Sequence, residues 1–387
     1  MNPAEWLVRT ACLSPTAPAL LKGEKIEADY ATFATRVAAI AGALCAKHRI
    51  CKGSRVAIFM SNSTEYLEAM YGIWFAGAVV VPINAKLHAK EAAWIIENAE
   101  AEIAFVSSDV GKALQAFAPE CLKELIYADL PEFSLLRQHV EMARPKEMHE
   151  DELLWLFYTS GTTGRPKGVM ISSGNISSMA LAYFSDVDEV DCKDAILYAA
   201  PMSHGAGIYN FMHVIRGARH VVPDSHGFDA DEILELAPKI DNISMFAAPT
   251  MVKRLVERAR AVDSNGKGVK TIIYAGGPMY VADIITAVAV LGNKFVQVYG
   301  QGECPMGITS LRRHFVSDRN HPNWRVRLGS VGVAQSPVLV RISDETGTTL
   351  TRGEIGEILV SGTTVMSGYW QNPEATAKTI RDGWLWT

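Results

Sequence analysis

A segment rich in glycine and hydroxyl groups, set between two apolar runs, is the part of this sequence best suited to chemistry. Residues 158–170 read Tyr-Thr-Ser-Gly-Thr-Thr-Gly-Arg-Pro-Lys-Gly-Val-Met. Glycines let backbone N–H groups approach an anion, hydroxyls donate further hydrogen bonds, and Lys167 adds a mobile positive charge. The segment therefore predicts a polyphosphate-binding loop, the alternative being a flexible surface loop.

The segment differs from the Walker A phosphate loop. That pattern places Gly-Lys before Ser or Thr at the start of a helix. Here Pro166 precedes Lys167 and Gly168 follows it. Apolar runs at residues 153–157 and 169–171 instead predict a strand on each side of the loop.

The elements that must position this loop alternate along the chain. Apolar runs predict strands at 55–60, 79–82 and 103–106, and amphipathic segments predict helices at 63–78 and 90–100, with Ser63 as an N-cap. After the loop, helices are predicted at 175–184, 207–216, 229–237, 250–261 and 281–291, and strands at 195–199, 220–222, 243–247, 271–275 and 295–299. From about Trp324, short strands with turns replace this alternation. The pattern predicts an α/β fold with a largely parallel sheet and a small β-barrel-like element.

Bulk properties exclude several classes of protein. The chain has 387 residues, a net charge of −5 and no basic block, so nucleic acid is not an expected partner. Its longest apolar runs fall short of the ~20 residues of a membrane-spanning helix. The six cysteines form no Cys-x-x-Cys pair and the N-terminus lacks a signal-peptide pattern, so we expect a cytoplasmic protein with reduced thiols.

Further segments follow the loop in a fixed order. They are Pro-Met-Ser-His-Gly at 201–205, Ala-Gly-Gly-Pro at 275–278, Val-Tyr-Gly-Gln-Gly-Glu at 298–303, and Gly-Glu-Ile-Gly-Glu-Ile at 353–358, running on to Gly-Tyr-Trp at 368–370. Together with the loop they resemble the adenylate-forming (AMP-binding) superfamily, in its acyl- and aryl-CoA synthetase branch. The resemblance implies two layered α/β subdomains, 1–183 (ending with the phosphate loop) and 184–323, and a β-barrel-like subdomain at 324–387. Ligands would lie in the crevice between them.

The resemblance also implies the chemistry. A substrate carboxylate attacks the α-phosphate of ATP, pyrophosphate leaves and an acyl-adenylate forms, with Mg²⁺ as cofactor and CoA as co-substrate. Catalytic roles fall on Thr163, Lys167, His204 and Glu303, and Mg²⁺ contacts on Thr163 and Glu303. ATP or AMP would be bound by Thr159, Ser160, Gly161, Thr162, Thr163, Gly164, Lys167, Gly276, Gly277, Pro278, Tyr299, Gly300, Gln301, Gly302 and Glu303.

Glu303 and His204 each admit a plainer interpretation, a solvated turn carboxylate and a core histidine. Glu303 ends a tight turn directly after a buried strand, where Mg²⁺ could take one carboxylate together with substrate phosphates. The family usually has Thr before this Glu, and Gly302 removes that hydroxyl. We expect His204 to orient the acid rather than act as a base, because a carboxylic acid is already ionised at pH 7.

The predicted acyl pocket is small and uncharged. Amino-acid-activating relatives carry an Asp where this chain has Gly205, so no partner awaits an ammonium group. Such a pocket favours an uncharged fatty or aromatic acid. Its residues would be His204, Gly205, Ala206, Gly207, Asn210, Gly277, Met306 and Gly307.

The expected function is therefore an AMP-forming carboxylic acid–CoA ligase. A luciferase-like adenylate-forming enzyme and a non-catalytic nucleotide- or acyl-binding protein are the alternatives, and a homodimer is left open. The resemblance implies that Thr387 would be followed by a Gly-Asp pair, a hinge and a small C-terminal cap domain that carries the adenylation lysine. This cap domain is therefore expected to be absent from the sequence. We expect a truncated piece of a longer protein, with a natural fragment as the alternative, and weak activity at most from these residues alone.

Overall fold

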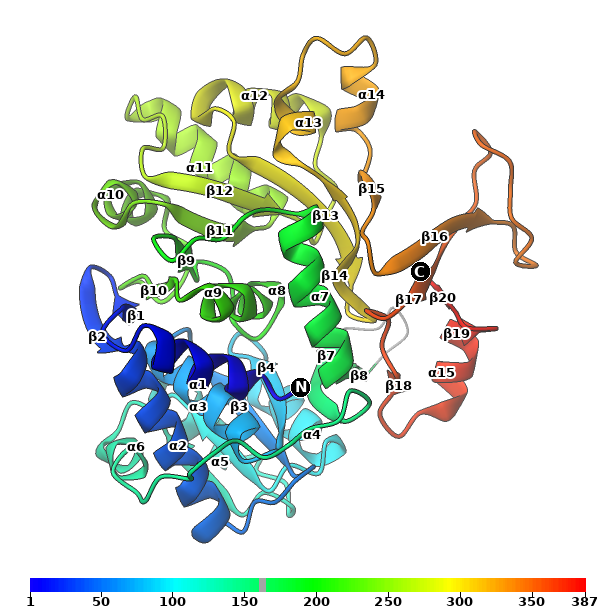
Figure 1. The fold of residues 1–387 in the computed structure, drawn as a ribbon. Coiled ribbons are helices and arrows are strands. Elements are labelled where there is room, and N and C mark those ends of the chain that lie inside the picture. Colours follow the sequence, from blue (N-terminus) through cyan, green and yellow to red (C-terminus); the bar gives the residue numbers. More distant parts are fainter. Residues whose placement is uncertain (160–164) are drawn as a thin grey trace.

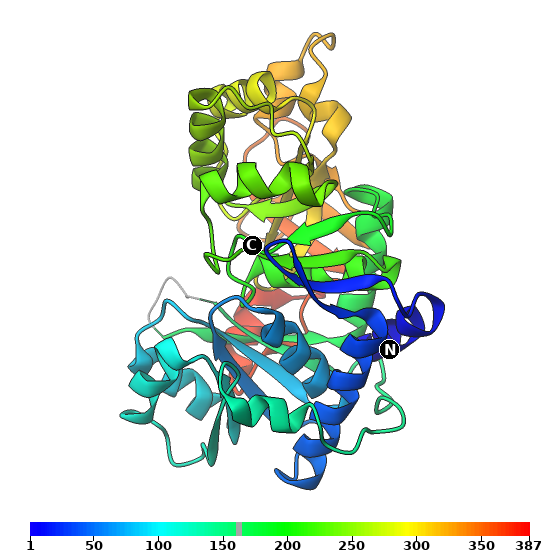
Figure 2. The same ribbon diagram turned by 90° about the vertical axis from the view of Figure 1, so that its left-hand side faces the viewer.

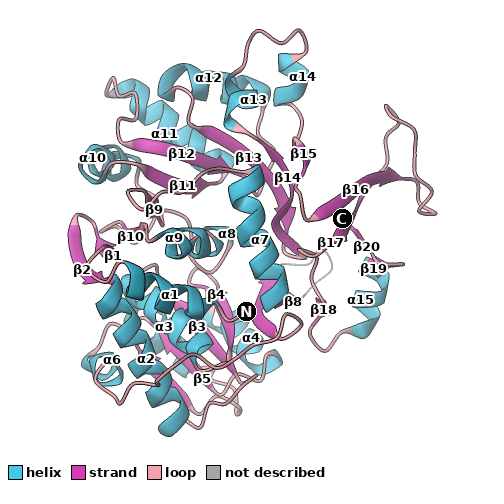
Figure 3. Cartoon of the chain, in the orientation of Figure 1, coloured by secondary structure: helices cyan, strands magenta, loops and turns pink. Residues whose placement is uncertain are grey.

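The computed structural model describes residues 1–159 and 165–387. Within these residues the strands form three sheets, and helices lie between and outside them (Figures 1 and 3). The predicted α/β class is confirmed. No helix in the described part of the chain is long and apolar enough to cross a membrane.

The first sheet carries the strands on both sides of the phosphate-binding segment. Its order is β18-β8-β7-β4-β3-β5-β6, parallel from β7 to β6, with β8 and β18 antiparallel. The strands are β3 (Arg55–Met60), β4 (Val79–Asn84), β5 (Ile103–Val106), β6 (Glu124–Tyr127), β7 (Leu153–Thr159), β8 (Lys167–Ser172) and β18 (Gly368–Tyr369).

The second sheet has the order β15-β14-β13-β12-β11-β9-β10-β1-β2. It is parallel from β13 to β1 and antiparallel at both edges. The strands are β1 (Pro18–Lys22), β2 (Lys25–Asp29), β9 (Ala195–Leu197), β10 (Arg219–Val222), β11 (Ile243–Ala247), β12 (Val269–Tyr274), β13 (Phe295–Gln301), β14 (Cys304–Leu311) and β15 (Val333–Ala334).

Strand pairing crosses the boundaries expected from the sequence. Strands β1 and β2 precede residue 183 but pair within the second sheet, and β18 follows residue 324 but joins the first. Each large sheet therefore draws strands from distant parts of the chain. The division into 1–183, 184–323 and 324–387 stays a prediction.

The small sheet is antiparallel, in the order β16-β17-β20-β19. Its strands are β16 (Val338–Ser343), β17 (Glu357–Gly362), β19 (Ile380–Arg381) and β20 (Trp384–Trp386). Among the described residues its outer strands β16 and β19 do not pair with each other, and β19 and β20 are short. The expected β-barrel-like element is thus present as a small open sheet, since closing a barrel requires every strand to pair on both sides.

Helices cover both large sheets, so that the molecule is layered (Figure 2). The layer between these sheets contains α1 (Pro3–Leu13), α2 (Tyr30–Ala46), α3 (Thr64–Phe75), α7 (Ser173–Asp186), α8 (Gly205–Ile208) and α9 (Asn210–Arg216). The outer face of the first sheet is covered by α4 (Ala89–Asn98) and α5 (Ser108–Gln115), and α6 (Pro131–Leu136) packs at its edge. The outer face of the second sheet is covered by α10 (Ala230–Ile240), α11 (Pro249–Ala261), α12 (Val281–Leu291), α13 (Arg313–Ser317) and α14 (Trp324–Leu328), while α15 (Pro373–Thr379) lies beside β18.

Aromatic packing in the middle layer fixes the strand that leads into the phosphate segment. The ring of Trp74 on α3 lies 5.9 Å from Trp155 on β7 and 5.2 Å from Phe211 on α9, measured between centroids. Such ring pairs contribute about 0.5–1.5 kcal/mol each beyond the area they bury. Strand β7 is thereby held against α3 and α9.

Most predicted elements have bounds close to those expected, and β3, β5, β11 and α12 have the same bounds. Ser63 caps α3 as predicted, and its hydroxyl accepts a hydrogen bond from the Tyr66 N–H at 3.2 Å. The single helix expected over 207–216 was wrong, because it divides at Tyr209 into α8 and α9. The Tyr209 N–H donates to Ala206 three residues back, at 3.3 Å, a 3₁₀-type turn that interrupts the α pattern.

Candidate active site

Strands β7 and β8 bring together the two ends of the predicted phosphate-binding segment. Thr159 ends β7, Lys167 begins β8, and the two residues pair in antiparallel register. A cavity of about 270 Å³ adjoins Lys167 and is lined also by Arg165, Trp94 and Trp370. The other predicted loop residues lie outside the described residues: Ser160, Gly161, Thr162, Thr163 and Gly164.

The hairpin of β13 and β14 carries Glu303 at its turn, where Gln301 and Cys304 pair. The turn packs on the end of β7. A Cβ atom built on Gly302 would lie 2.1 Å from Thr159 Cγ2 and 3.3 Å from the ring of Phe157. Glycine is therefore what allows a hairpin of the second sheet to reach the phosphate segment of the first.

Tyr369 contacts both Glu303 and Lys167. Its hydroxyl donates a hydrogen bond of 2.5 Å to Glu303 Oε1, and Lys167 Nζ lies 4.8 Å from the centre of its ring. Burial, and then the hydrogen bond to Glu303, raise the pKa of Tyr369 above its ordinary value. The phenol therefore stays protonated at neutral pH and acts as the donor.

Glu303 can accommodate a cation that arrives with a nucleotide. It is partly buried, and its Oε2 atom has no protein partner among the described residues. The described part of the chain holds no group of three or more His, Cys, Asp or Glu side chains arranged as a metal site. Because Mg²⁺ is commonly bound by one or two carboxylates plus substrate phosphates, a carboxylate oxygen that has no partner among the described residues, in the hairpin that packs on Thr159, suits this ion.

His204 follows β9 and lies at the N-terminus of the short helix α8. Its Nδ1 atom is 2.9 Å from the hydroxyl of Ser203, and its ring meets the ring of Phe157 edge-on at 5.5 Å. Burial lowers the pKa of His204 below its ordinary value, so the imidazole is neutral at pH 7. A neutral, packed ring can orient a ligand by contact and hydrogen bonding.

Small residues from separate segments meet the ring of Phe246 on β11. A Cβ atom on Gly205 would lie 3.5 Å from Phe246 Cζ and 3.6 Å from Met306 Sδ, and one on Gly276 would lie 3.8 Å from the same Phe246 atom. Phe246 is partly buried and stacks on Tyr209, with centroids 6.0 Å apart. Gly205, Gly276 and Met306 are thus gathered around one aromatic side chain.

Three further predicted acyl-pocket residues are buried or tightly packed. A Cβ atom on Gly207 would lie 1.9 Å from the carbonyl oxygen of Met202, and one on Gly307 would lie 3.0 Å from the Thr364 side chain. Asn210 is fully buried, accepts a hydrogen bond from Tyr71 at 2.6 Å and donates to the Gly207 carbonyl at 2.5 Å. That these residues line the acyl pocket stays a prediction, and the same holds for Ala206 and Gly277.

The predicted nucleotide segments leave neighbouring parallel strands. Gly276, Gly277 and Pro278 follow β12, and Tyr299 to Gln301 end β13, which pairs with β12. Gly276 has φ = +79°, a backbone conformation that favours glycine. A Cβ atom on Gly300 would lie 2.4 Å from the Met306 backbone N. The two segments therefore lie side by side at the carboxyl ends of their strands, where ligands bind in open α/β sheets.

With this geometry established, residues 7–370 match the model of the family described as AMP-binding enzyme. The chain belongs to the AMP-binding enzyme family. The resemblance stated from the motifs is thereby confirmed.

Relatives of this AMP-binding enzyme agree in sequence and in fold. A feruloyl-CoA synthase from an Amycolatopsis species is 30% identical over 384 residues, 98% of this chain and 74% of the relative. The N-terminal domain of FACL13 from Mycobacterium tuberculosis superposes with a TM-score of 0.89 at 26% identity, covering 100% of this chain and 96% of that one. O-succinylbenzoate CoA synthetase from Bacillus subtilis, solved with AMP, superposes with a TM-score of 0.84 at 26% identity, covering 99% and 74%.

Sequence reasoning missed two aromatic residues of this AMP-binding enzyme, Tyr369 and Phe246. Tyr369 lies in the Gly-Tyr-Trp segment that supported the resemblance, but nothing local indicates that it reaches Glu303, 66 positions away. Phe246 is the next-to-last residue of the run at 243–247, which reads as an ordinary buried strand. An aromatic residue near the carboxyl end of a predicted parallel strand, where ligands bind in open α/β sheets, is the signal that could have singled it out.

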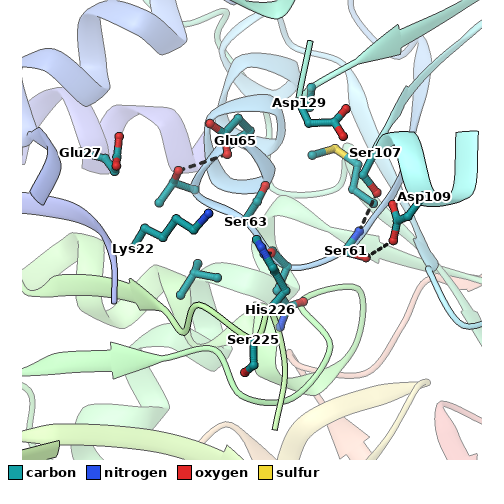
Figure 4. Close-up of a pocket in the computed structure, with 15 residues that line it drawn as sticks. Lys22, Glu27, Ser61, Ser63, Glu65, Ser107, Asp109, Asp129, Ser225 and His226 are labelled. Carbon is teal, nitrogen blue, oxygen red and sulfur yellow. Dashed lines mark hydrogen bonds between the residues drawn. The ribbon is translucent and has the colours of Figure 1, made fainter. Parts of the chain in front are cut away.

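A second cavity of the AMP-binding enzyme, of about 680 Å³, opens where β3, β5 and β10 end (Figure 4). The predicted site residues do not line its described wall. Its carboxylates already have protein partners: Asp109 accepts from the Ser61 hydroxyl at 2.7 Å, and Glu65 pairs with Arg137 at 3.1 Å. The cavity is thus a polar crevice whose acidic groups are satisfied within the protein.

Proposed function

We propose that this chain is an AMP-forming carboxylic acid–CoA ligase that acts through an acyl-adenylate. The observation that carries the proposal is the meeting of Lys167 and Glu303 at Tyr369, in a member of a family whose named relatives include CoA synthases. One ammonium group and one carboxylate at the end of a phosphate segment match the charges that adenylation requires. ATP and CoA are the proposed co-substrates.

In the first step, an oxygen of the acid's carboxylate bonds to the α-phosphorus of ATP. The bond from that phosphorus to the bridging oxygen breaks, and pyrophosphate leaves with the electron pair. Lys167 and the N–H and hydroxyl groups of the loop bind the β- and γ-phosphates and offset the charge that develops there. In the second step the sulfur of CoA bonds to the acyl carbon and AMP leaves, while the thiol proton passes to solvent.

Glu303 would hold Mg²⁺ through Oε2, and Thr163 is the proposed second protein ligand. The bound ion would supply further charge neutralisation at the phosphates. Glu303 contributes a fixed carboxylate at the hairpin turn, while Tyr369 occupies its other oxygen. The chain therefore needs no acidic cluster of its own for this ion.

The remaining predicted residues would bind and orient the reactants. Tyr299 would present its ring to adenine beside the segment 276–278. His204, neutral at pH 7, would orient the acid without taking a proton, since the acid is already ionised. Gly205, Met306 and Phe246 offer an uncharged, partly aromatic surface to the tail of the acid, so we propose an uncharged fatty or aromatic acid.

The test is acid-dependent pyrophosphate release from ATP by the full-length protein, followed by thioester formation with CoA, across a panel of fatty and aromatic acids. Lys167→Gln is the matched loss-of-charge variant and should lower pyrophosphate release strongly. Pyrophosphate release without thioester formation would overturn the proposal of CoA ligation and would indicate that the adenylate is used in another reaction. If the protein binds nucleotide but releases no pyrophosphate with any acid, the proposal that it is an enzyme would be overturned. Location in the cytoplasm and assembly as a homodimer stay predictions, which fractionation and gel filtration can test.

A further inference from the structure

Tyr369 contacts both charged groups to which the proposed function assigns nucleotide chemistry. Its hydroxyl donates to Glu303 Oε1 at 2.5 Å, and its ring lies 4.8 Å from Lys167 Nζ. Among the described residues no ion pair joins Lys167 directly to Glu303. The phenol ring and its hydroxyl therefore link the two groups without a direct ion pair between them.

Tyr369 is held in place by the strand that carries Lys167. Strand β18 pairs with β8 with Tyr369 opposite Val169, and the Tyr369 N–H donates to the Thr376 hydroxyl at 2.9 Å. Tyr369 is 5% exposed. A buried residue fixed by sheet pairing on one side and by α15 on the other has little freedom to reorient. The Tyr369 hydroxyl, which lies outside the β13–β14 hairpin, thus fixes the orientation of the Glu303 carboxylate.

The separation of the two charges has a physical consequence. A lysine and a glutamate in contact attract each other strongly, especially in a partly buried site. A direct pair would take the ammonium group away from a phosphate and the carboxylate away from a cation. The ring face of Tyr369 offers Lys167 a weaker partner that it can leave when an anion arrives, and the hydroxyl satisfies one Glu303 oxygen while leaving the other.

We propose that Tyr369 is a positioning residue that orients Glu303 toward a divalent cation and keeps Lys167 available for phosphate. This inference rests on the proposed function, since it assigns Tyr369 a role toward the same nucleotide site. Partners that orient metal ligands in this manner typically change metal affinity about 10- to 100-fold when they are removed. Tyr369→Phe removes only the hydroxyl, whereas Tyr369→Leu also removes the ring face.

The experiment measures binding of a non-cleavable ATP analogue by titration calorimetry at increasing Mg²⁺ concentrations. We expect Tyr369→Phe to raise the Mg²⁺ concentration for half-maximal binding about tenfold and to leave Mg²⁺-free binding nearly unchanged. Tyr369→Leu should weaken Mg²⁺-free binding as well, because Lys167 can then pair with Glu303. Tyr127→Phe, which removes a hydroxyl on the distant strand β6, is the matched control and should match wild type.

Combining the variant with Glu303→Gln separates positioning from a general structural effect. If Tyr369 acts through Glu303, Tyr369→Phe should add nothing to the Mg²⁺ dependence of Glu303→Gln. Full additivity, or an unchanged Mg²⁺ dependence in Tyr369→Phe alone, would overturn the inference. Failure of wild type to bind the analogue would instead count against the proposed function. If analogue binding depends on Mg²⁺ equally in wild type and in Tyr369→Phe, the proposed role of Tyr369 would be wrong while the proposed function would stand.

Discussion

The methyl group of Thr159 lies where Gly302 would carry a side chain. A Cβ atom at Gly302 would be 2.1 Å from Thr159 Cγ2, well inside van der Waals contact. The last residue of β7 and the residue before Glu303 therefore fit together only because one of them is glycine. Since β7 belongs to the first sheet and the hairpin to the second, this contact sets how closely the two halves of the proposed nucleotide site approach each other.

Gly302→Ala should disturb this contact and lower the free energy of unfolding by about 1–3 kcal/mol, as overpacking does in tight sites. The cause can be isolated by a second substitution, Thr159→Ser, which removes Cγ2 and keeps the hydroxyl. In the Thr159→Ser background, Gly302→Ala should cost clearly less. Urea denaturation of the four proteins measures both values. Equal losses in the two backgrounds would contradict the assigned contact.

Gly207 and Gly205 should respond differently to alanine. A Cβ atom at Gly207 meets the Met202 carbonyl oxygen at 1.9 Å, whereas the nearest atom to one at Gly205 is at 3.5 Å. Backbone atoms cannot move aside as a flexible side chain can, so Gly207→Ala should lower the free energy of unfolding by about 1–3 kcal/mol or more. Gly205→Ala should change it by less than about 1 kcal/mol. Thermal and urea unfolding of both variants provide the measurement. A Gly207→Ala variant with the same free energy of unfolding as wild type would contradict the prediction.

Local signals in the sequence were enough for the elements and the phosphate segment. Hydrophobic periodicity placed α12 at residues 281–291 and β11 at 243–247, because burial imposes the same period on sequence and structure. What it could not give is long-range pairing. The joining of β1 to β10 and of β18 to β8 depends on residues far apart in the chain.

The same limit explains how much of the candidate site was predicted. Glu303 and Lys167 belong to recognisable segments, but their common contact with Tyr369 follows from the pairing of β18 with β8. The exclusion of a side chain at Gly302 depends on the approach of two sheets, which no local pattern encodes.

Two buried histidines should make the protein less stable in acid. Burial lowers the pKa of His213 to about 4, against weaker raising contributions from the hydrogen bond to the Tyr209 carbonyl and from Asp194, and burial lowers the pKa of His220 well below its ordinary value. The unfolded chain takes up protons near pH 6.5 while the folded chain does not. Stability is therefore complete above about pH 6.5 and is lost as the pH falls from there toward the folded pKa.

For His213 this loss should reach about 2 kcal/mol between pH 7 and pH 5. His213→Gln removes the titration but keeps a donor for the Tyr209 carbonyl, to which Nδ1 donates at 2.8 Å. Its unfolding free energy, measured by urea denaturation, should fall less steeply over this range than that of wild type. If the unfolding free energies of the two proteins change in parallel with pH, His213 takes up no proton when the chain unfolds.

Phe246 should set the size of acid that the proposed ligase accepts. Its ring meets Gly205 and Gly276 and stacks on the buried Tyr209, so truncation should open space beside the tail of the acid. Removing a side chain of this size from an apolar pocket changes discrimination by about 1–3 kcal/mol, or roughly tenfold or more in kcat/KM. Phe246→Ala should therefore raise the ratio of kcat/KM for a biphenyl carboxylic acid over benzoate by about tenfold.

Phe315→Ala, at a similarly half-buried ring on the outer side of the second sheet, is the matched control and should leave the ratio unchanged. An equal fall in kcat/KM for both acids in Phe246→Ala would mean that Phe246 supports the fold of the site without contacting the tail of the acid.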